Sequence, residues 1–106
     1  SSWAGLVCAS REESAFRQEL LLAAVLAPLA LWMPATVVET AMMLASLVLV
    51  LIVELLNSSV EAAVDRISFS RHGLSKRAKD YGSAAVMLAI ILCGAVYALV
   101  AAKYYL

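Results

Sequence analysis

The sequence has few of the residues that mark common soluble enzyme sites. Its four glycines are isolated, so it contains neither a P-loop nor a Gly-x-Gly-x-x-Gly turn. It has a single histidine, His72, and no recognisable Ser-His-Asp set. The two cysteines, Cys8 and Cys93, lie in different kinds of segment, and one pair is no disulfide framework. The formal net charge is zero, which argues against a general attraction to nucleic acid.

Apolar residues are what the chain has in excess. Of its 106 residues 64% are hydrophobic, and the mean hydropathy is +0.91, whereas a soluble domain is nearer half apolar. This composition predicts a small, all-α integral membrane protein that crosses the bilayer several times. A span needs about 20 residues. We therefore expect one membrane domain over residues 1–106, with a surface helix at about 1–12 and spans at about 14–33, 37–68 and 76–103.

The first thirty residues allow more than one interpretation. Residues 1–12 are weakly amphipathic, and Trp3 favours the membrane interface, so we expect a short surface helix; a frayed end is the alternative. The stretch from Arg11 to Met33 also resembles a secretory signal, but two further apolar segments follow it. Because residues 1–12 resemble the middle of a helix and the chain does not begin with Met, we expect that further residues precede Ser1.

Short polar motifs predict where the helices begin. Ser10 with Glu13 and Thr36 with Glu39 both fit the capping box, which gives Glu13 a purely structural alternative role. Residues 68–75 form a predicted polar loop, and Ser75 is the expected N-cap of the third span. An aromatic belt is expected at the far end of that span, formed by Tyr97, Tyr104 and Tyr105. Small residues of the same span would permit close helix packing: Ala85, Ala89, Gly94 and Ala98.

The basic residues are distributed unevenly. Two of the eight precede the first span, five lie between the second and third spans, and only Lys103 lies at the other end. Basic residues collect on the cytoplasmic side of membrane proteins. The asymmetry predicts that the N-terminus and the second connection are cytoplasmic.

The chain is organised around residues 54–65. On a helix, Glu54, Asn57, Glu61 and Asp65 lie at i, i+3, i+7 and i+11, so they share one face of an otherwise apolar segment. If Thr36 caps the helix, Glu54 lies only about 3 Å inside the predicted membrane boundary, at 1.5 Å per residue. Intramembrane carboxylates are costly and face a protein interior or a cavity. This face therefore predicts a site at the cytoplasmic interface.

Carboxylates beside a basic loop fit phosphoryl transfer to a lipid. Mg²⁺ prefers carboxylate and phosphate oxygens, and a lipid hydroxyl would reach Glu54 first. Purely structural alternatives stay open: Asp65 could simply form a salt bridge with Arg66 or Lys79, and His72 could be solvated. A small oligomeric transporter with a carboxylate relay is a second class, although transporter sites favour the midplane. A regulatory membrane subunit is a third. Since three spans cannot enclose a polar site, we expect an oligomer with sites between protomers.

Three motifs resemble the prokaryotic diacylglycerol kinase family, which includes undecaprenol kinases. They are Glu13 with Ala15-Phe-Arg-Gln-Glu19, Glu54-Leu-Leu-Asn-Ser-Ser-Val-Glu-Ala-Ala-Val-Asp-Arg66, and Leu74-Ser75 with Ala78-Lys-Asp-Tyr-Gly-Ser-Ala-Ala85. The resemblance covers essentially the whole chain at consistent spacing. It implies a homotrimer with shared sites and phosphorylation of diacylglycerol by ATP with Mg²⁺. Undecaprenol is the alternative substrate, although the span pattern looks more like the diacylglycerol type.

The resemblance also implies roles for individual residues. Glu54 would be the general base, supported by Asn57, and Asp65 would have a supporting role. Glu13 and Glu61 would hold the metal. The nucleotide would contact Glu13, Glu61, Lys79, Asp80 and, in a poorly matched loop, Ser70, Arg71 and His72. The lipid substrate would lie near Gln18, Glu19, Glu54 and Ser83. In one departure from the family pattern, Glu12 stands where relatives often have Asn and adds a charge beside Glu13.

Overall fold

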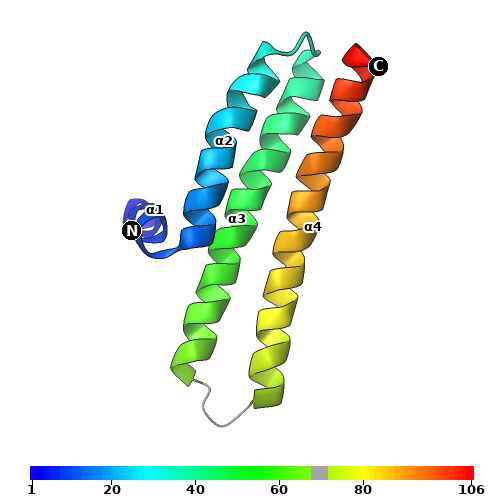
Figure 1. Cartoon of the computed structure of the whole chain (residues 1–106). Helices are drawn as coiled ribbons and strands as arrows, with labels where there is room; N and C mark the ends of the chain where they lie inside the picture. Colours follow the sequence, from blue (N-terminus) through cyan, green and yellow to red (C-terminus); the bar gives the residue numbers. More distant parts are fainter. Residues whose placement is uncertain (68–71) are drawn as a thin grey trace.

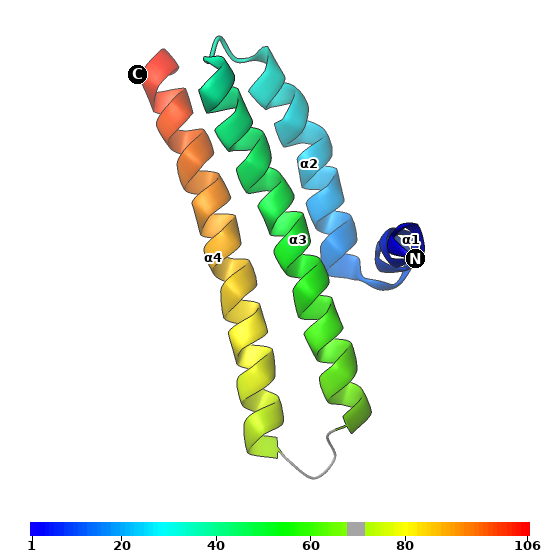
Figure 2. The ribbon, with the colours of Figure 1, turned by 180° about the vertical axis from the view of Figure 1, so that it is seen from behind.

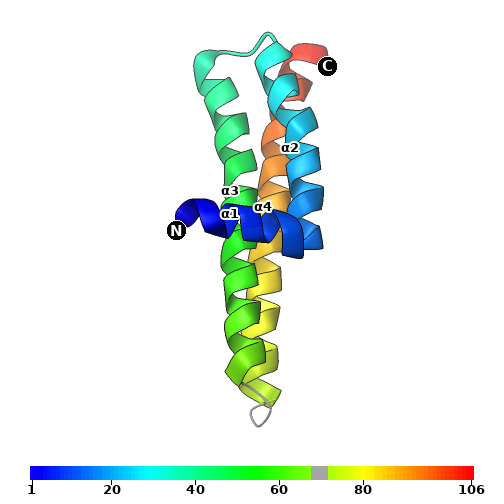
Figure 3. The ribbon, with the colours of Figure 1, turned by 90° about the vertical axis from the view of Figure 1, so that its left-hand side faces the viewer.

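The computed structural model describes residues 1–67 and 72–106, nearly all of them helical. The helices are α1 (Ser2–Glu12), α2 (Ser14–Trp32), α3 (Val37–Ile67) and α4 (His72–Tyr105). Helices α2, α3 and α4 run side by side as an elongated bundle of 53 × 28 × 19 Å, and α1 lies across it (Figures 1 and 3). The predicted all-α fold, with three spans and an N-terminal helix, is confirmed.

The three long helices are each long and apolar enough to cross a membrane. Most of their apolar side chains face outward: Leu21 is 71% exposed and Leu99 72% exposed. Figures 1 and 2 show the three helices side by side from opposite sides, and exposed apolar residues occur on all three of them. Such a surface suits hydrocarbon and not water, so the chain is a multi-pass membrane protein.

The bundle core is formed mainly where α3 meets α4. Helix α3 buries a stripe at helical spacing, Met43, Leu47, Val50 and Glu54. Helix α4 buries Ala89, Cys93, Tyr97 and Val100. The Tyr97 hydroxyl donates to the carbonyl of Leu26 in α2, at 2.9 Å, so its polar end is paired inside the bundle.

One prediction for α4 is corrected by this core. Tyr97 does not belong to an exposed aromatic belt, because it is 8% exposed and packs among the helices. Of the small residues, Ala89 is buried, and Gly94 lines a cavity between the helices. Ala85 and Ala98 are exposed in the single chain, so a part in close helix packing stays a prediction for them.

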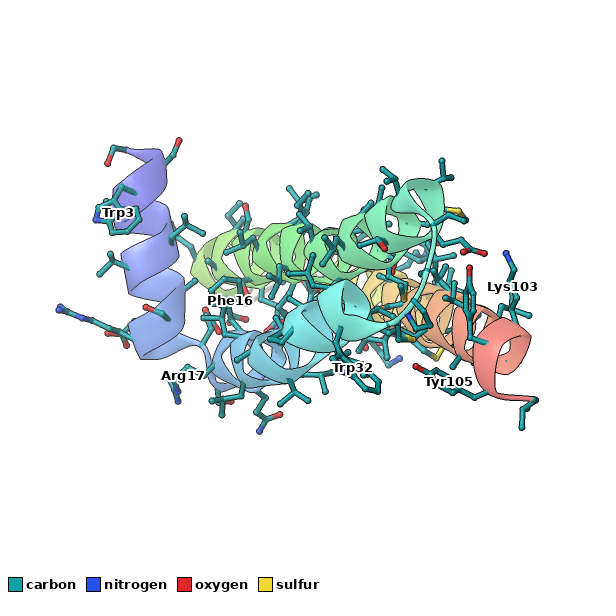
Figure 4. All side chains as sticks on the ribbon, turned by 90° about the horizontal axis from the view of Figure 1, so that it is seen from above. Trp3, Phe16, Arg17, Trp32, Lys103 and Tyr105 are labelled. Carbon is teal, nitrogen blue, oxygen red and sulfur yellow. The ribbon has the colours of Figure 1, made fainter. Side chains whose placement is uncertain are left out.

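The capping box at the start of α3 is confirmed. The backbone N–H of Thr36 donates to the Glu39 carboxylate at 2.9 Å, and the N–H of Glu39 donates to the Thr36 hydroxyl at 3.1 Å. The carboxylate of Glu39 also accepts from Lys103, at 2.8 Å, and from the hydroxyl of Tyr104. The cap thus ties the start of α3 to the end of α4, on the side of the molecule away from α1 (Figure 4).

The capping box predicted at Ser10 and Glu13 is wrong. Ser10 lies inside α1, and its hydroxyl donates to the Val7 carbonyl at 2.8 Å. The chain breaks at Glu13, whose extended backbone (φ −110°, ψ 107°) separates α1 from α2. Arg17 stabilises this break by donating to the Arg11 carbonyl, at 2.7 Å, because the last carbonyls of a helix need partners.

The expected start of the third span also differs from the structure. Helix α4 begins at His72, so Ser75 is not its N-cap, and the predicted polar loop over 68–75 is helical from residue 72 onward. The long, flexible Lys and Arg side chains that follow are good helix formers, which favours extension of the helix in this direction. Pro28 lies inside α2 without ending it, as membrane helices tolerate.

Candidate active site

The polar residues predicted for the site gather at the end of the bundle near α1. In Figure 1, α2 begins level with α1, whereas α3 and α4 continue past it as a pair. Glu54 lies in the three-helix part, and its side chain is 5% exposed. Glu61 and Asp65 lie further along α3, where they are exposed. The face of four polar residues thus runs from a buried carboxylate to exposed carboxylates.

Glu54 faces a second carboxylate inside the bundle. Glu19, from α2, is its direct neighbour, and the buried Oε2 atom of Glu19 has no hydrogen-bond partner among the described residues. Two adjacent carboxylates repel when both are ionised, so such pairs share a proton or a cation. The pair can therefore accept a proton from a hydroxyl group that reaches it.

An apolar cavity of about 220 Å³ adjoins this carboxylate pair. Besides Glu19, side chains of all three long helices line it, among them Leu22, Leu26, Val50, Ile90 and Cys93. A volume of this size accommodates a segment of hydrocarbon chain. The arrangement therefore places proton-accepting oxygens at the edge of a space that suits an apolar group.

Asn57 and Glu61 form a hydrogen-bonded pair one and two turns beyond Glu54. The side-chain amide of Asn57 donates to the Glu61 carboxylate at 2.8 Å. The sequence prediction assigned Asn57 to Glu54, whereas the structure places its donor on Glu61. A carboxylate oriented by an amide is pre-arranged for a cation or for polar groups of a ligand.

The exposed end of the site is crossed by ion pairs. Lys79 of α4 lies 2.5 Å from Asp65 of α3, and Glu61 also contributes to the negative field around Lys79. The open alternative that Asp65 pairs with Lys79 is thus confirmed. Asp80 pairs with Lys76 one turn away along α4, at 2.6 Å. Exposed pairs of this kind are weak and exchange partners readily, so both lysines can turn to a phosphate.

Glu13 lies beside a different face of α3 from the one that contains Glu54 and Glu61. It borders a second cavity, of about 570 Å³, between α1 and α3, and this cavity is also lined by Ser58 and Ser59 of α3. Sequence reasoning missed these two serines, because they stand outside the face that contains Glu54 and Glu61. In the described part of the chain, no group of three or more His, Cys, Asp or Glu side chains is placed to hold a metal ion.

Other predicted site residues are less informative. Gln18 and Ser83 are exposed, on α2 and α4. Ser70 and Arg71 lie outside the described residues, and His72 is described only as the first residue of α4. Gly82 is a residue whose part in the site sequence reasoning missed: it is the point of α4 that meets Asn57.

Three helices long and apolar enough to span a membrane, with carboxylates and lysines gathered toward one end, define an integral membrane protein with a candidate site at that end. The sequence model described as prokaryotic diacylglycerol kinase matches residues 1–101. A diacylglycerol kinase of Haemophilus influenzae is 48% identical over 93 residues, covering 88% of this chain and 79% of that protein. One of Pseudomonas aeruginosa is 54% identical over 89 residues, covering 84% and 72%. The Escherichia coli K12 diacylglycerol kinase is 47% identical over 91 residues, covering 86% and 75%. The chain belongs to the prokaryotic diacylglycerol kinase family.

Proposed function

We propose that the chain is a lipid kinase that transfers the γ-phosphoryl group of ATP to diacylglycerol and yields phosphatidic acid. The observation that carries the proposal is the placement of Glu54. Glu54 is 5% exposed and neighbours Glu19, and Glu19 lines the apolar cavity inside the helix bundle. A lipid whose chain occupies this apolar space presents its hydroxyl to the carboxylate pair.

The transfer itself needs a base and a charge-neutralising clamp. The lipid hydroxyl oxygen forms a bond to the γ-phosphorus, the bond from that phosphorus to the β–γ bridging oxygen breaks, and ADP leaves. Glu54 accepts the hydroxyl proton, a role typically worth about 10²–10⁴ in rate. Lys79 and Asp80 contact the nucleotide after leaving their present partners, Asp65 and Lys76.

Magnesium fits the carboxylates at the exposed end of the site. Mg²⁺ in nucleotide enzymes is held by one or two carboxylates together with phosphate oxygens. Glu61, oriented by Asn57, and Glu13 are suited to this role, and a full protein cage of three ligands is not required. When bound, the ion offsets the charge of the phosphate oxygens during transfer.

The site also favours an assembly. Glu61 is exposed in the single chain, and Glu13 borders a different cavity from the one beside Glu54. We infer a homotrimer in which Glu13 of one protomer meets Glu61 of another, with the N-terminus and the site on the cytoplasmic side of the inner membrane. The seven basic residues at that end of the spans support this orientation.

Phosphate transfer by the purified protein in mixed micelles tests the proposal. Radiolabelled ATP with Mg²⁺ is supplied with diacylglycerol in one sample and with undecaprenol in the other. We expect labelled phosphatidic acid and much less labelled polyprenol. Preference for undecaprenol would reassign the substrate within the family, and no transfer to either lipid would contradict the proposed function.

A further inference from the structure

Gly82 occupies a position where local helix preference alone would not place a glycine. It lies in the interior of α4, where glycine is less favourable than alanine because it loses more backbone freedom on folding. No glycine of the chain adopts a positive φ, so backbone conformation does not require glycine here. The reason must lie in what the residue packs against.

A side chain at position 82 would meet Asn57. A Cβ atom built on Gly82 would overlap Asn57 Oδ1 and would stand 3.2 Å from Asn57 Cγ. The same test at Gly5, Gly73 and Gly94 meets nothing within 4 Å among the described residues. Close approach of α4 to α3 is therefore specific to this one glycine, at the level of the candidate site.

The amide of Asn57 is held in one orientation by this packing. Its Nδ2 donates to Glu61 at 2.8 Å. Its Oδ1 is buried against Gly82 and has no hydrogen-bond partner within the described ranges 1–67 and 72–106. A flipped amide would turn a carbonyl oxygen toward the Glu61 carboxylate and leave an N–H group buried without an acceptor. An unpaired buried oxygen is tolerated at a cost, which indicates that this orientation has a use.

We propose that Gly82 is a positioning residue that acts through Asn57 to orient the Glu61 carboxylate toward the Mg²⁺-bound phosphates of ATP. The inference rests on the proposed function, since it assigns Glu61 to Mg²⁺–ATP. The atoms that a Cβ would displace are the end of a flexible side chain. Gly82→Ala should therefore rotate the Asn57 amide away from Glu61 while α3 and α4 stay packed.

The experiment is a double-mutant cycle with Gly82→Ala, Asn57→Ala and the double variant, in mixed micelles. Gly73→Ala, the same substitution at an open position of α4, is the matched control, and Glu61→Gln is the reference for loss of the carboxylate. The measured quantities are the KM for Mg²⁺–ATP, the KM for diacylglycerol, kcat, and the thermal midpoint of the purified protein.

We expect Gly82→Ala to raise the KM for Mg²⁺–ATP by about tenfold, as for loss of one hydrogen bond to a charged group. The KM for diacylglycerol and kcat at saturating Mg²⁺–ATP should stay close to wild type, and Gly73→Ala should change none of them. Asn57→Ala should have the same effect as Gly82→Ala, and the double variant should be no worse than either, because both remove the same contact.

Stability gives a second, independent readout. In the Asn57→Ala background, Gly82→Ala should raise the thermal midpoint, because the clash is gone and alanine is the better helix former. With Asn57 present, it should lower the midpoint or leave it unchanged. If Gly82→Ala alone does not fold, the double variant must fold, and its failure to do so overturns the proposal.

Three other results would also overturn the proposal. They are an unchanged KM for Mg²⁺–ATP in Gly82→Ala, effects of the two substitutions that multiply in the double variant, and coupling seen in the thermal midpoint but not in the KM. The last result would reduce Gly82 to a packing residue. A wild-type protein that phosphorylates no diacylglycerol would instead contradict the proposed function. The effect of Gly82→Ala on the thermal midpoint, compared with and without Asn57, would still show whether residues 82 and 57 are in contact.

Discussion

At the scale of single residues, burial separates the two central carboxylates of α3. Glu54 is 5% exposed and lies against Glu19 inside the bundle. Glu61 is exposed and accepts a hydrogen bond from the side-chain amide of Asn57. A buried carboxylate with a like-charged neighbour is suited to accept a proton, because protonation relieves the repulsion. An exposed carboxylate oriented by an amide is suited to a metal ion.

Glu54→Gln tests the first of these roles. Glutamine keeps the shape of the side chain and offers Glu19 an N–H donor, but it cannot take the hydroxyl proton. We expect turnover to fall by about 10²–10⁴, the contribution of a general base, while Mg²⁺–ATP binding stays near wild type in a direct titration. Glu39→Gln, the same change at the opposite end of the bundle, is the control and should retain turnover. Near-normal activity of Glu54→Gln, or a loss fully explained by weaker nucleotide binding, would remove Glu54 from the chemistry.

At the scale of helices, the ends remote from the site are joined to one another by side-chain hydrogen bonds and an ion pair. Thr36 and Glu39 cap α3, and Glu39 is joined to Lys103 and Tyr104 of α4. Figure 4 shows Trp32, Lys103 and Tyr105 at this end and Trp3 and Arg17 at the other. The connection between α2 and α3 is therefore held to the end of α4 by side chains that take no part in the proposed reaction.

Thr36→Ala should weaken the fold without changing the chemistry. It removes the hydroxyl that accepts from the Glu39 N–H, and loss of an N-cap costs about 0.5–2 kcal/mol. We expect a lower denaturation midpoint in micelles and unchanged KM values for both substrates. Thr36→Ser keeps the hydroxyl and should retain most of the stability. An altered KM for Mg²⁺–ATP in Thr36→Ala would show that this end communicates with the site.

The helices themselves could be predicted from the sequence, whereas several of their ends and faces could not. Long apolar runs predict spans whatever their partners are, which is why three helices were expected. The cap at Thr36 was found because both of its hydrogen bonds are local. The cap at Ser10 was wrong, although the expected surface helix ends where α1 does, because the break at Glu13 depends on Arg17, which reaches back to Arg11. The buried face of α4 depends on packing against α2 and α3, which a uniformly apolar sequence does not encode.

The site could be predicted in the same partial way. The spacing of Glu54, Asn57, Glu61 and Asp65 places them on one face of any helix, and the structure confirms that α3 is helical throughout this stretch. The pairing of Glu19 with Glu54 and the approach of Gly82 to Asn57 join different helices. Contacts of this kind require the relative height and rotation of helices, which periodicity within one segment does not give.

At the scale of the whole molecule, the single chain does not enclose the proposed reaction. The α3–α4 extension stands beyond α1 with Glu61, Asp65 and Lys79 exposed (Figures 1 and 3). Phosphoryl transfer works by alignment and charge neutralisation in a site that excludes water. An open pair of helices does not exclude water, which supports our proposal that a neighbouring protomer covers this face.

Complementation between inactive variants tests whether protomers share a site. Glu13 borders the cavity between α1 and α3, away from the cavity that Glu19 lines. We proposed that Glu13 of one protomer meets Glu61 of another, and Glu61 stands on the same helix as Glu54. Glu13→Gln and Glu54→Gln should each be inactive alone. When the two proteins are unfolded together and reconstituted as mixed assemblies, some sites receive both intact glutamates, and activity should return. A mixture of Glu54→Gln with Glu61→Gln is the matched control, because both residues stand on α3. If one protomer supplies both of them to a site, no activity should return in this mixture. Absence of any recovery in assemblies shown by crosslinking to be mixed would place Glu13 and Glu54 of one site within the same chain.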